Sequence, residues 1–250
     1  MIASTDHKLY QKYQKAADKK GGSILKNIRT CKGGGKGLIA GAIVLLVFTL
    51  PITILGFVTN ADTIIPVLLS VPGLLLLILG IVLRNKRNAG WVSYYQKESG
   101  FSETELQQVD RELSSPSTTI AVCRYPGTVK DSYIAAFFTE HYLILNGGIE
   151  PYLWRLDDII AAGFSDSGDI WCMALLTVHD KETRGINCLI TDTDKKPALA
   201  NEILQELSRR NPKILCGQDI VCDGRHYILE RDGAQLLRLH QEGRTLETAQ

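Results

Sequence analysis

Two long apolar runs dominate the first third of the chain. Residues 38 to 58 carry no charge, and fourteen of these 21 residues are Leu, Ile, Val or Phe. Residues 64 to 83 form a second uncharged run of 20 residues, of which fifteen are strongly apolar. A helix needs about 20 apolar residues to cross the hydrocarbon core of a bilayer. Each run therefore predicts one transmembrane helix.

The charges around the two runs predict their orientation. Only residues 59 to 63 separate the runs, so the helices are expected to form an antiparallel hairpin with a short extracytoplasmic loop. Nine Lys or Arg residues precede the first run, none lies in the loop and three follow the second run. Because basic flanks stay on the cytoplasmic side, both termini are expected in the cytoplasm of a multi-pass plasma-membrane protein. The bases that flank the membrane are Lys32, Lys36, Arg84, Lys86 and Arg87.

Residues 84 to 116 predict a juxtamembrane linker that contains one short helix. Ser102 and Glu105 have the spacing of a capping box, in which each residue satisfies a backbone N–H of the other. Apolar residues then recur every three or four positions until Pro116 ends the pattern. This spacing is typical of an amphipathic helix.

Beyond Pro116 the pattern changes to short runs rich in Val, Ile, Tyr and Phe, separated by turn sequences. This alternation predicts about seven antiparallel strands. A final amphipathic helix is expected from Asp194, its N-cap, to Asn211, because apolar residues recur between them at helical spacing. The predicted strands cover residues 118–124, 133–139, 141–146, 151–156, 158–163, 170–179 and 184–191.

Two short sequences in this region carry a family resemblance. Residues 137 to 145, FFTEHYLIL, and residues 154 to 160, WRLDDII, resemble those of pleckstrin-homology-like domains, specifically the small bacterial versions attached to membrane helices. The resemblance covers residues 118 to 210 and places the chain beside uncharacterised bacterial membrane proteins. It implies an α+β domain over residues 117 to 211, in which an antiparallel barrel of about seven strands is capped by a C-terminal helix. Such folds host unrelated functions, so a binding or scaffolding role is implied rather than an activity.

The same resemblance points to two headgroup candidates. Eukaryotic relatives of the fold bind phosphoinositide headgroups with a basic first hairpin, and the corresponding region here offers Arg124 and Lys130. Charge argues against that role, because residues 88 to 250 carry 16 bases and 24 acids, a net charge of −8. The acidic balance also argues against nucleic acid as a partner. We therefore expect the bilayer and another protein as partners, the protein bound along a sheet edge or as a second copy of the chain.

The two ends of the chain have contrasting character. Residues 1 to 37 form a basic cytosolic segment with a net charge of +7, which is expected either to lie on an anionic leaflet or to be a disordered tail. Residues 212 to 250 form a C-terminal extension with two predicted strands that turn at Asp223 and Gly224. This extension is expected to extend the sheet or to pack on its face.

Candidate chemistry along the chain is sparse. Six cysteines occur without a CxxC pair, and five histidines occur outside recognisable catalytic motifs. The paired carboxylates Asp157 with Asp158 and Asp192 with Asp194 lack the further oxygen ligands of a calcium loop and suit turns and caps. We expect no catalytic residue, no metal and no cofactor.

These patterns predict a non-enzymatic, membrane-anchored cytosolic interaction or scaffolding module. The main alternative is an accessory subunit of a transport or membrane-protein complex, in which the hairpin packs against other spans. Headgroup binding and an unrecognised enzyme are further alternatives. The sequence names neither the molecular partner nor the oligomeric state.

Overall fold

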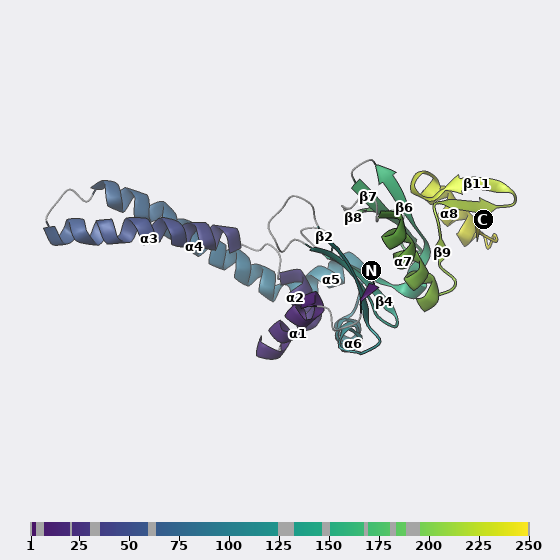
Figure 1. Ribbon diagram of the computed structural model, residues 1–250, viewed down its shortest axis with the longest axis horizontal. Coiled ribbons are helices and arrows are strands. Elements are labelled where there is room, and N and C mark those ends of the chain that lie inside the picture. Colours follow the sequence, from purple (N-terminus) through teal and green to yellow (C-terminus); the bar gives the residue numbers. More distant parts are fainter. Residues whose placement is uncertain are drawn as a thin grey trace. The chain divides into compact units, whose positions relative to one another are not determined.

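The computed structural model describes residues 2–3, 8–20, 22–30, 36–59, 64–124, 133–146, 151–167, 170–180, 184–188 and 196–249. The chain divides into two units, of which one comprises Met1–Asn27 with Tyr95–Gln250 and the other comprises Ile28–Tyr94. The fold is mixed α/β, with eight α-helices and three sheets among the described residues (Figure 1). The first unit thus joins segments that lie on both sides of the apolar runs in the sequence.

The second unit contains the two long helices α3 (Lys36–Thr59) and α4 (Ile64–Ala89), which lie along each other (Figure 1). Their contact is close, because a Cβ atom added to Gly73 of α4 would lie 3.0 Å from Leu46 of α3. A larger residue at this position would push the two helices apart.

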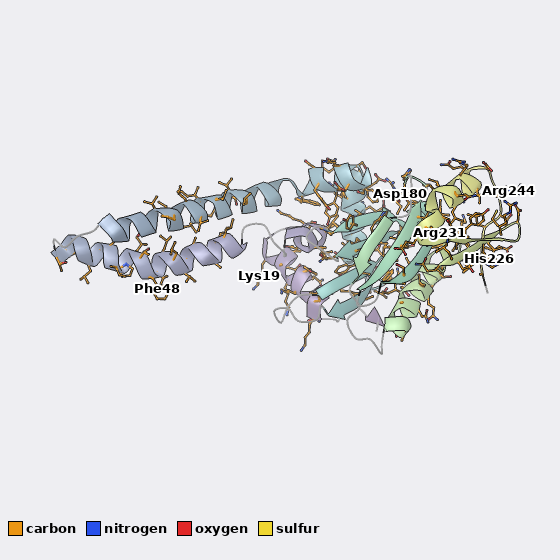
Figure 2. The ribbon with its side chains drawn as sticks, turned by 90° about the horizontal axis from the view of Figure 1, so that it is seen from above. Lys19, Phe48, Asp180, His226, Arg231 and Arg244 are labelled. Carbon is orange, nitrogen blue, oxygen red and sulfur yellow. The ribbon has the colours of Figure 1, made fainter. Side chains whose placement is uncertain are left out.

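Most apolar side chains of these helices are exposed. Phe48 of α3 is 69% exposed and Val58 is 76% exposed, and Phe48 is labelled in Figure 2. Among the described residues, Gly37–Leu55 is the one helical stretch long and apolar enough to cross a membrane, and Ser70–Leu83 of α4 is a shorter apolar stretch. One apolar helix with an exposed surface accords with membrane association, which is the coarser part of the two-span prediction.

Two sheets form the centre of the first unit. Strands β2 to β8 begin and end within about four residues of the seven predicted strands, so the strand prediction is confirmed. The first sheet has antiparallel neighbours in the order β1 (Ile2–Ala3), β2 (Thr119–Arg124), β3 (Tyr133–Phe138), β4 (Tyr142–Asn146) and β5 (Tyr152–Arg155). The second sheet has the order β8 (Arg184–Cys188), β7 (Ile170–Thr177), β6 (Ile159–Ser167) and β9 (Leu215–Cys216).

The described strands are not closed into a barrel, which corrects that part of the fold prediction. The 3-10 turn η1 (Leu156–Asp158) interrupts the extended chain between β5 and β6. In addition, β9 runs parallel to β6 and pairs with its edge, while β1 pairs with the edge of β2. Two of the four sheet edges are thus occupied by short strands, and the described strands form separate sheets.

The core of the first unit lies between the two sheets and helix α7 (Lys196–Arg210). Side chains alternate along a strand, so Phe138 and Leu143 face this core from the first sheet and Met173 faces it from the second. Ile203 and Leu207 of α7 complete it, and these residues belong to the predicted apolar stripe. The predicted N-cap, Asp194, lies outside the described residues.

Helix α1 (Lys8–Lys20) belongs to the first unit and packs against the face of the first sheet that is opposite this core. Asn146 of β4 donates a hydrogen bond to the Tyr13 hydroxyl at 3.1 Å, and the Tyr13 ring lies 6.0 Å from that of Phe137 in β3. The Tyr10 hydroxyl donates to the carbonyl of Leu113. The prediction of a disordered basic tail is therefore wrong for residues 8 to 20, because their apolar side buries against a sheet whose β4 is buried on both faces.

Helix α6 (Glu103–Leu113) contacts both of the N-terminal helices, α1 and α2 (Ile24–Thr30). Its predicted capping box is confirmed: the Ser102 N–H donates to the Glu105 carboxylate at 2.8 Å, and the Glu105 N–H donates to the Ser102 hydroxyl at 3.3 Å. One turn further on, Asp110 accepts a hydrogen bond from the Leu25 N–H at 2.9 Å, in the first turn of α2. A carboxylate from α6 thus satisfies an orphan donor of α2.

The C-terminal extension covers the outer face of the second sheet. Strands β10 (Asp219–Cys222) and β11 (Arg225–Ile228) form the predicted hairpin, and its turn has positive φ at Asp223 and Gly224. Helix α8 (Leu229–Gln241) then packs Leu236 against Ile160 and its neighbours. The extension therefore both adds β9 to the sheet and packs on its face.

Close packing is required where β9 ends, because a Cβ atom at Gly163 would lie 2.7 Å from the Gly217 carbonyl oxygen.

The α6–α2 contact generates a stability prediction. Burial raises the pKa of the Asp110 carboxyl, although hydrogen bonds from Leu25 and Ser23 oppose part of that shift. The folded state therefore holds this proton more tightly than the unfolded chain, so the contribution of the shift is present at low pH and is lost as the pH rises through the raised pKa. At pH 7 we expect Asp110→Ala to lower the free energy of unfolding by about 1 kcal/mol. Asp110→Asn keeps the acceptor without the buried charge and should stay near the native value in thermal unfolding followed by tryptophan fluorescence. Equal losses for the two variants would contradict this role.

Candidate binding surface

Three described carboxylate clusters in the first unit hold its elements together. Glu112 of α6 accepts hydrogen bonds from the Thr139 hydroxyl at 2.8 Å and the His141 N–H at 3.0 Å, and its other oxygen lies 2.8 Å from His141 Nδ1. Burial raises the pKa of this carboxyl, but the hydrogen bonds from His141 and Thr139 outweigh burial, so the net pKa is lowered. Glu112 therefore fixes the β3–β4 turn to α6, and His141 takes part in that contact.

A second carboxylate cluster surrounds Arg155 of β5. Its Nε donates to Glu105 at 3.1 Å, its Nη1 donates to Asp158 at 3.1 Å, and its guanidinium carbon lies 4.2 Å from the Phe101 ring centroid. Asp157 instead accepts from the Asn211 amide at 3.1 Å. The paired aspartates thus bind different elements, and they diverge rather than share a cation.

A third cluster joins α7 to β2. The Glu206 side chain is 8% exposed and accepts hydrogen bonds from the Thr119 hydroxyl at 2.7 Å, from Arg209 Nε at 2.8 Å and from Arg210 Nε at 2.9 Å. Burial raises the pKa of this carboxyl, but the three donors outweigh it and lower the pKa to about 2. A buried carboxylate with this many donors stays ionised and serves packing.

The described thiols are poorly suited to nucleophilic chemistry. Burial raises the pKa of the Cys216 thiol to about 11, and that thiol donates to the Leu204 carbonyl. Cys222 is buried in the cluster beneath α8. Because the thiolate is the reactive form, a raised pKa makes Cys216 unreactive near neutral pH. Among the described residues, His, Cys, Asp and Glu also form no group of three that would hold a metal.

The basic residues singled out in the sequence are placed only in part. Arg124 ends β2 and Lys36 begins α3, while Arg84, Lys86 and Arg87 lie in the last turns of α4. The side chains of these five residues lie outside the described set. Lys130 and Lys32 lie outside it entirely. The headgroup candidates Arg124 and Lys130 therefore remain predictions.

A basic surface that the sequence reasoning did not single out lies on α1. Lys8, Lys12, Lys15 and Lys19 are all exposed and recur at intervals of four, three and four residues. At 3.6 residues per turn these positions fall within an arc of about 60° around the helix axis. We call these four residues the lysine face. They line a hollow of about 450 Å³ together with Gln11 and Ala16.

The lysine face is opposite the buried side of the same helix. Tyr10 is 1% exposed, Tyr13 is 2% exposed and Ala17 is 6% exposed. The sequence pattern predicts one segment over residues 1 to 37, either on an anionic leaflet or disordered, whereas the structure turns the tyrosines of α1 inward and its lysines outward. The four-three-four spacing of the lysines is the signal that would have separated the two sides.

Comparisons of the chain with protein-family models, curated proteins and solved structures gave no match. The resemblance to bacterial pleckstrin-homology-like membrane proteins therefore remains a prediction from the sequence.

The Glu206 cluster generates a pH-dependent prediction. Because folding lowers the pKa of Glu206 from 4.5 to about 2, its stabilisation is present above pH 4.5 and is lost as the pH falls through about 2. At pH 7 we expect Glu206→Gln to lower the free energy of unfolding by about 2–3 kcal/mol, since the buried Arg210 guanidinium and the half-buried Thr119 hydroxyl lose a charged acceptor. The gap from the native protein should shrink as denaturant unfolding is repeated from pH 4.5 downward. Glu140→Gln, at an exposed turn position, is the matched control and should show no such gap.

Proposed function

We propose that this protein is a non-enzymatic, membrane-anchored cytosolic interaction module. In this proposal residues 38 to 83 form a two-span hairpin, both termini face the cytoplasm of a bacterial cell, and the first unit binds another protein near the inner leaflet. The observation that carries the proposal is that α1 and α6, which flank the apolar helices in the sequence, belong to one folded unit.

That shared unit limits how many times the chain can cross a bilayer. Tyr10 and Tyr13 precede the apolar helices and contact Leu113 and Asn146, which follow them. Two segments that pack together lie on one side of the membrane, so the chain between them must cross an even number of times. A single crossing by α3 would separate α1 from its sheet. This constraint supports α4 as the second span.

The composition of the helices is compatible with that role. Fourteen strongly apolar residues in α3 contribute roughly 4–8 kcal/mol to insertion at 0.3–0.6 kcal/mol each. Helix α4 has 26 residues and contains the uncharged stretch from 64 to 83. Nine bases before α3 and three after residue 83 support the cytoplasmic placement of both flanks.

The arrangement of the first unit supports a pleckstrin-homology-like relationship and a binding role. Four antiparallel strands, β2 to β5, precede three, β6 to β8, and α7 packs on the core between the two sheets. The carboxylate clusters around Glu105, Glu112 and Glu206 act as contacts between elements, which favours a binding module over an enzyme. Strand addition by a partner would fall to β5 or β8, the outermost strands of their sheets on the sides that β1 and β9 do not occupy.

Topology provides the first test of the proposal. An epitope inserted after Asp62 should be reached by antibody in cells whose outer envelope alone is opened. The same epitope after Gln250 should be reached only after the plasma membrane is permeabilised. A single span would place the Asp62 and Gln250 epitopes on the same side, and that result would contradict the hairpin.

An anchor exchange tests the interaction role. Residues 38 to 83 are replaced by an unrelated two-span hairpin of equal length in a full chain that carries a C-terminal biotin ligase. If the cytosolic unit binds the partner, the native and exchanged chains should label the same proteins, and the unrelated hairpin carrying the ligase alone should not. Loss of the labelled proteins on exchange would assign the partner to the hairpin, as in an accessory subunit of a membrane complex, and would overturn the proposed role.

A further inference from the structure

We infer that the lysine face of α1 is a contact surface for the anionic phospholipid headgroups of the membrane in which the protein is anchored. This inference rests on the membrane anchoring proposed above and names a ligand for residues other than the headgroup candidates Arg124 and Lys130. Lys8, Lys12, Lys15 and Lys19 carry it, and Lys19 is labelled in Figure 2.

The surface is held in one orientation by the buried side of α1. The hydrogen bonds of Tyr10 to Leu113 and of Asn146 to Tyr13, with the ring contact to Phe137, fix the rotation of α1 about its axis. Four ammonium groups therefore point outward together in the folded protein. A flexible tail with the same charges would have to order them on binding, which weakens binding.

Chain length keeps this surface close to a bilayer. Only residues 21 to 36 separate the end of α1 from the apolar stretch that begins at Gly37. Even fully extended, these 16 residues reach about 60 Å, and α2 shortens the path because a helix rises only about 1.5 Å per residue. A surface tethered at this range meets headgroups at a high effective concentration, so weak individual contacts suffice.

The distribution of charge favours a planar anionic partner. Helix α1 carries five lysines and one acid, Asp18, a net charge of +4, whereas residues 88 to 250 carry a net charge of −8. A flat surface that touches α1 interacts mainly with groups within a Debye length of about 8–10 Å. Acidic groups of the unit beyond that distance are screened from it. A nucleic acid or a large acidic protein that wraps the unit would meet that repulsion directly.

Contacts of this kind are electrostatic and have little headgroup specificity. Each base near an anionic leaflet strengthens binding by about fivefold. We therefore expect phosphatidylglycerol and phosphatidylserine to act alike. Raising the salt from about 0.1 M to 1 M shortens the Debye length from about 10 Å to 3 Å and should abolish the contact.

Residue-resolved lysine labelling of the full chain tests the inference. The protein is reconstituted in phosphatidylcholine nanodiscs with or without phosphatidylglycerol, and the rate of acetylation is measured for each lysine by mass spectrometry. In anionic discs we expect the four lysines of the lysine face to react about fivefold more slowly than in neutral discs. Exposed Lys213, after α7, should react at the same rate in both and is the internal control.

Matched variants separate the lysine face from overall charge. In Lys12→Glu with Lys15→Glu, the remaining Lys8 and Lys19 should react equally fast in both discs. Arg225→Glu with Arg238→Glu makes the same change in net charge at two exposed positions of the C-terminal extension and should keep the protection. If both variants unfold with the same midpoint temperature as the native protein, α1 is still folded in them.

The outcomes distinguish this inference from the proposed function. Equal labelling of the lysine face in neutral and anionic discs would overturn the inference and leave the anchored module intact. Protection that persists at 1 M salt or in the Lys12→Glu, Lys15→Glu variant would also overturn it, since it would not be electrostatic. Protection by added RNA in neutral discs, without any effect of phosphatidylglycerol, would assign the surface to nucleic acid instead. A chain that fails to enter nanodiscs would overturn the anchoring itself.

Discussion

The contact between α1 and the outer face of the first sheet is the constraint on which the rest of the structure depends. Both faces of β3 and β4 are apolar, and a sheet buried on both faces needs cover on both. Helix α7 covers one face of this sheet together with the second sheet. Helices α1 and α6 pack with the other, although about 80 residues of sequence, mostly the two apolar helices, separate them. The long helices must therefore leave and re-enter one folded unit.

This constraint links folding to topology. If the apolar helices cross a membrane, a hydrogen bond between Tyr10 and Leu113, or between Tyr13 and Asn146, can form only if the chain returns to the side from which it left. It also implies that the first unit is completed only after residues 95 to 113 have been made. The Asp110 contact with α2 joins the same two segments. Helix α1 and the start of α2 thus belong to the same folded unit as the two sheets.

Acidic and basic side chains occupy different places in that fold. Glu105 and Glu112 accept several hydrogen bonds from a neighbouring element, and Glu206 accepts one from β2 and two from its own helix, so acidic groups are concentrated where elements meet. The lysines of α1 lie instead on the side of the helix opposite its buried tyrosines. Multiple hydrogen bonds stabilise buried or half-buried carboxylates. A lysine can instead pack its aliphatic stem against the protein while its ammonium group stays in water. This division leaves the lysine face available to an external anion.

The sequence by itself determined the local elements. Hydrophobic periodicity and turn residues gave the strands, the capping box at Ser102 and Glu105 and the hairpin turn at Asp223 and Gly224, because these depend on neighbouring residues. Tertiary structure decided the rest. The open sheets, the addition of β9 to β6 and the docking of α1 depend on contacts between residues far apart in sequence. The lysine face follows from that docking, because periodicity shows which lysines lie together but only the buried tyrosines show which side of α1 faces water.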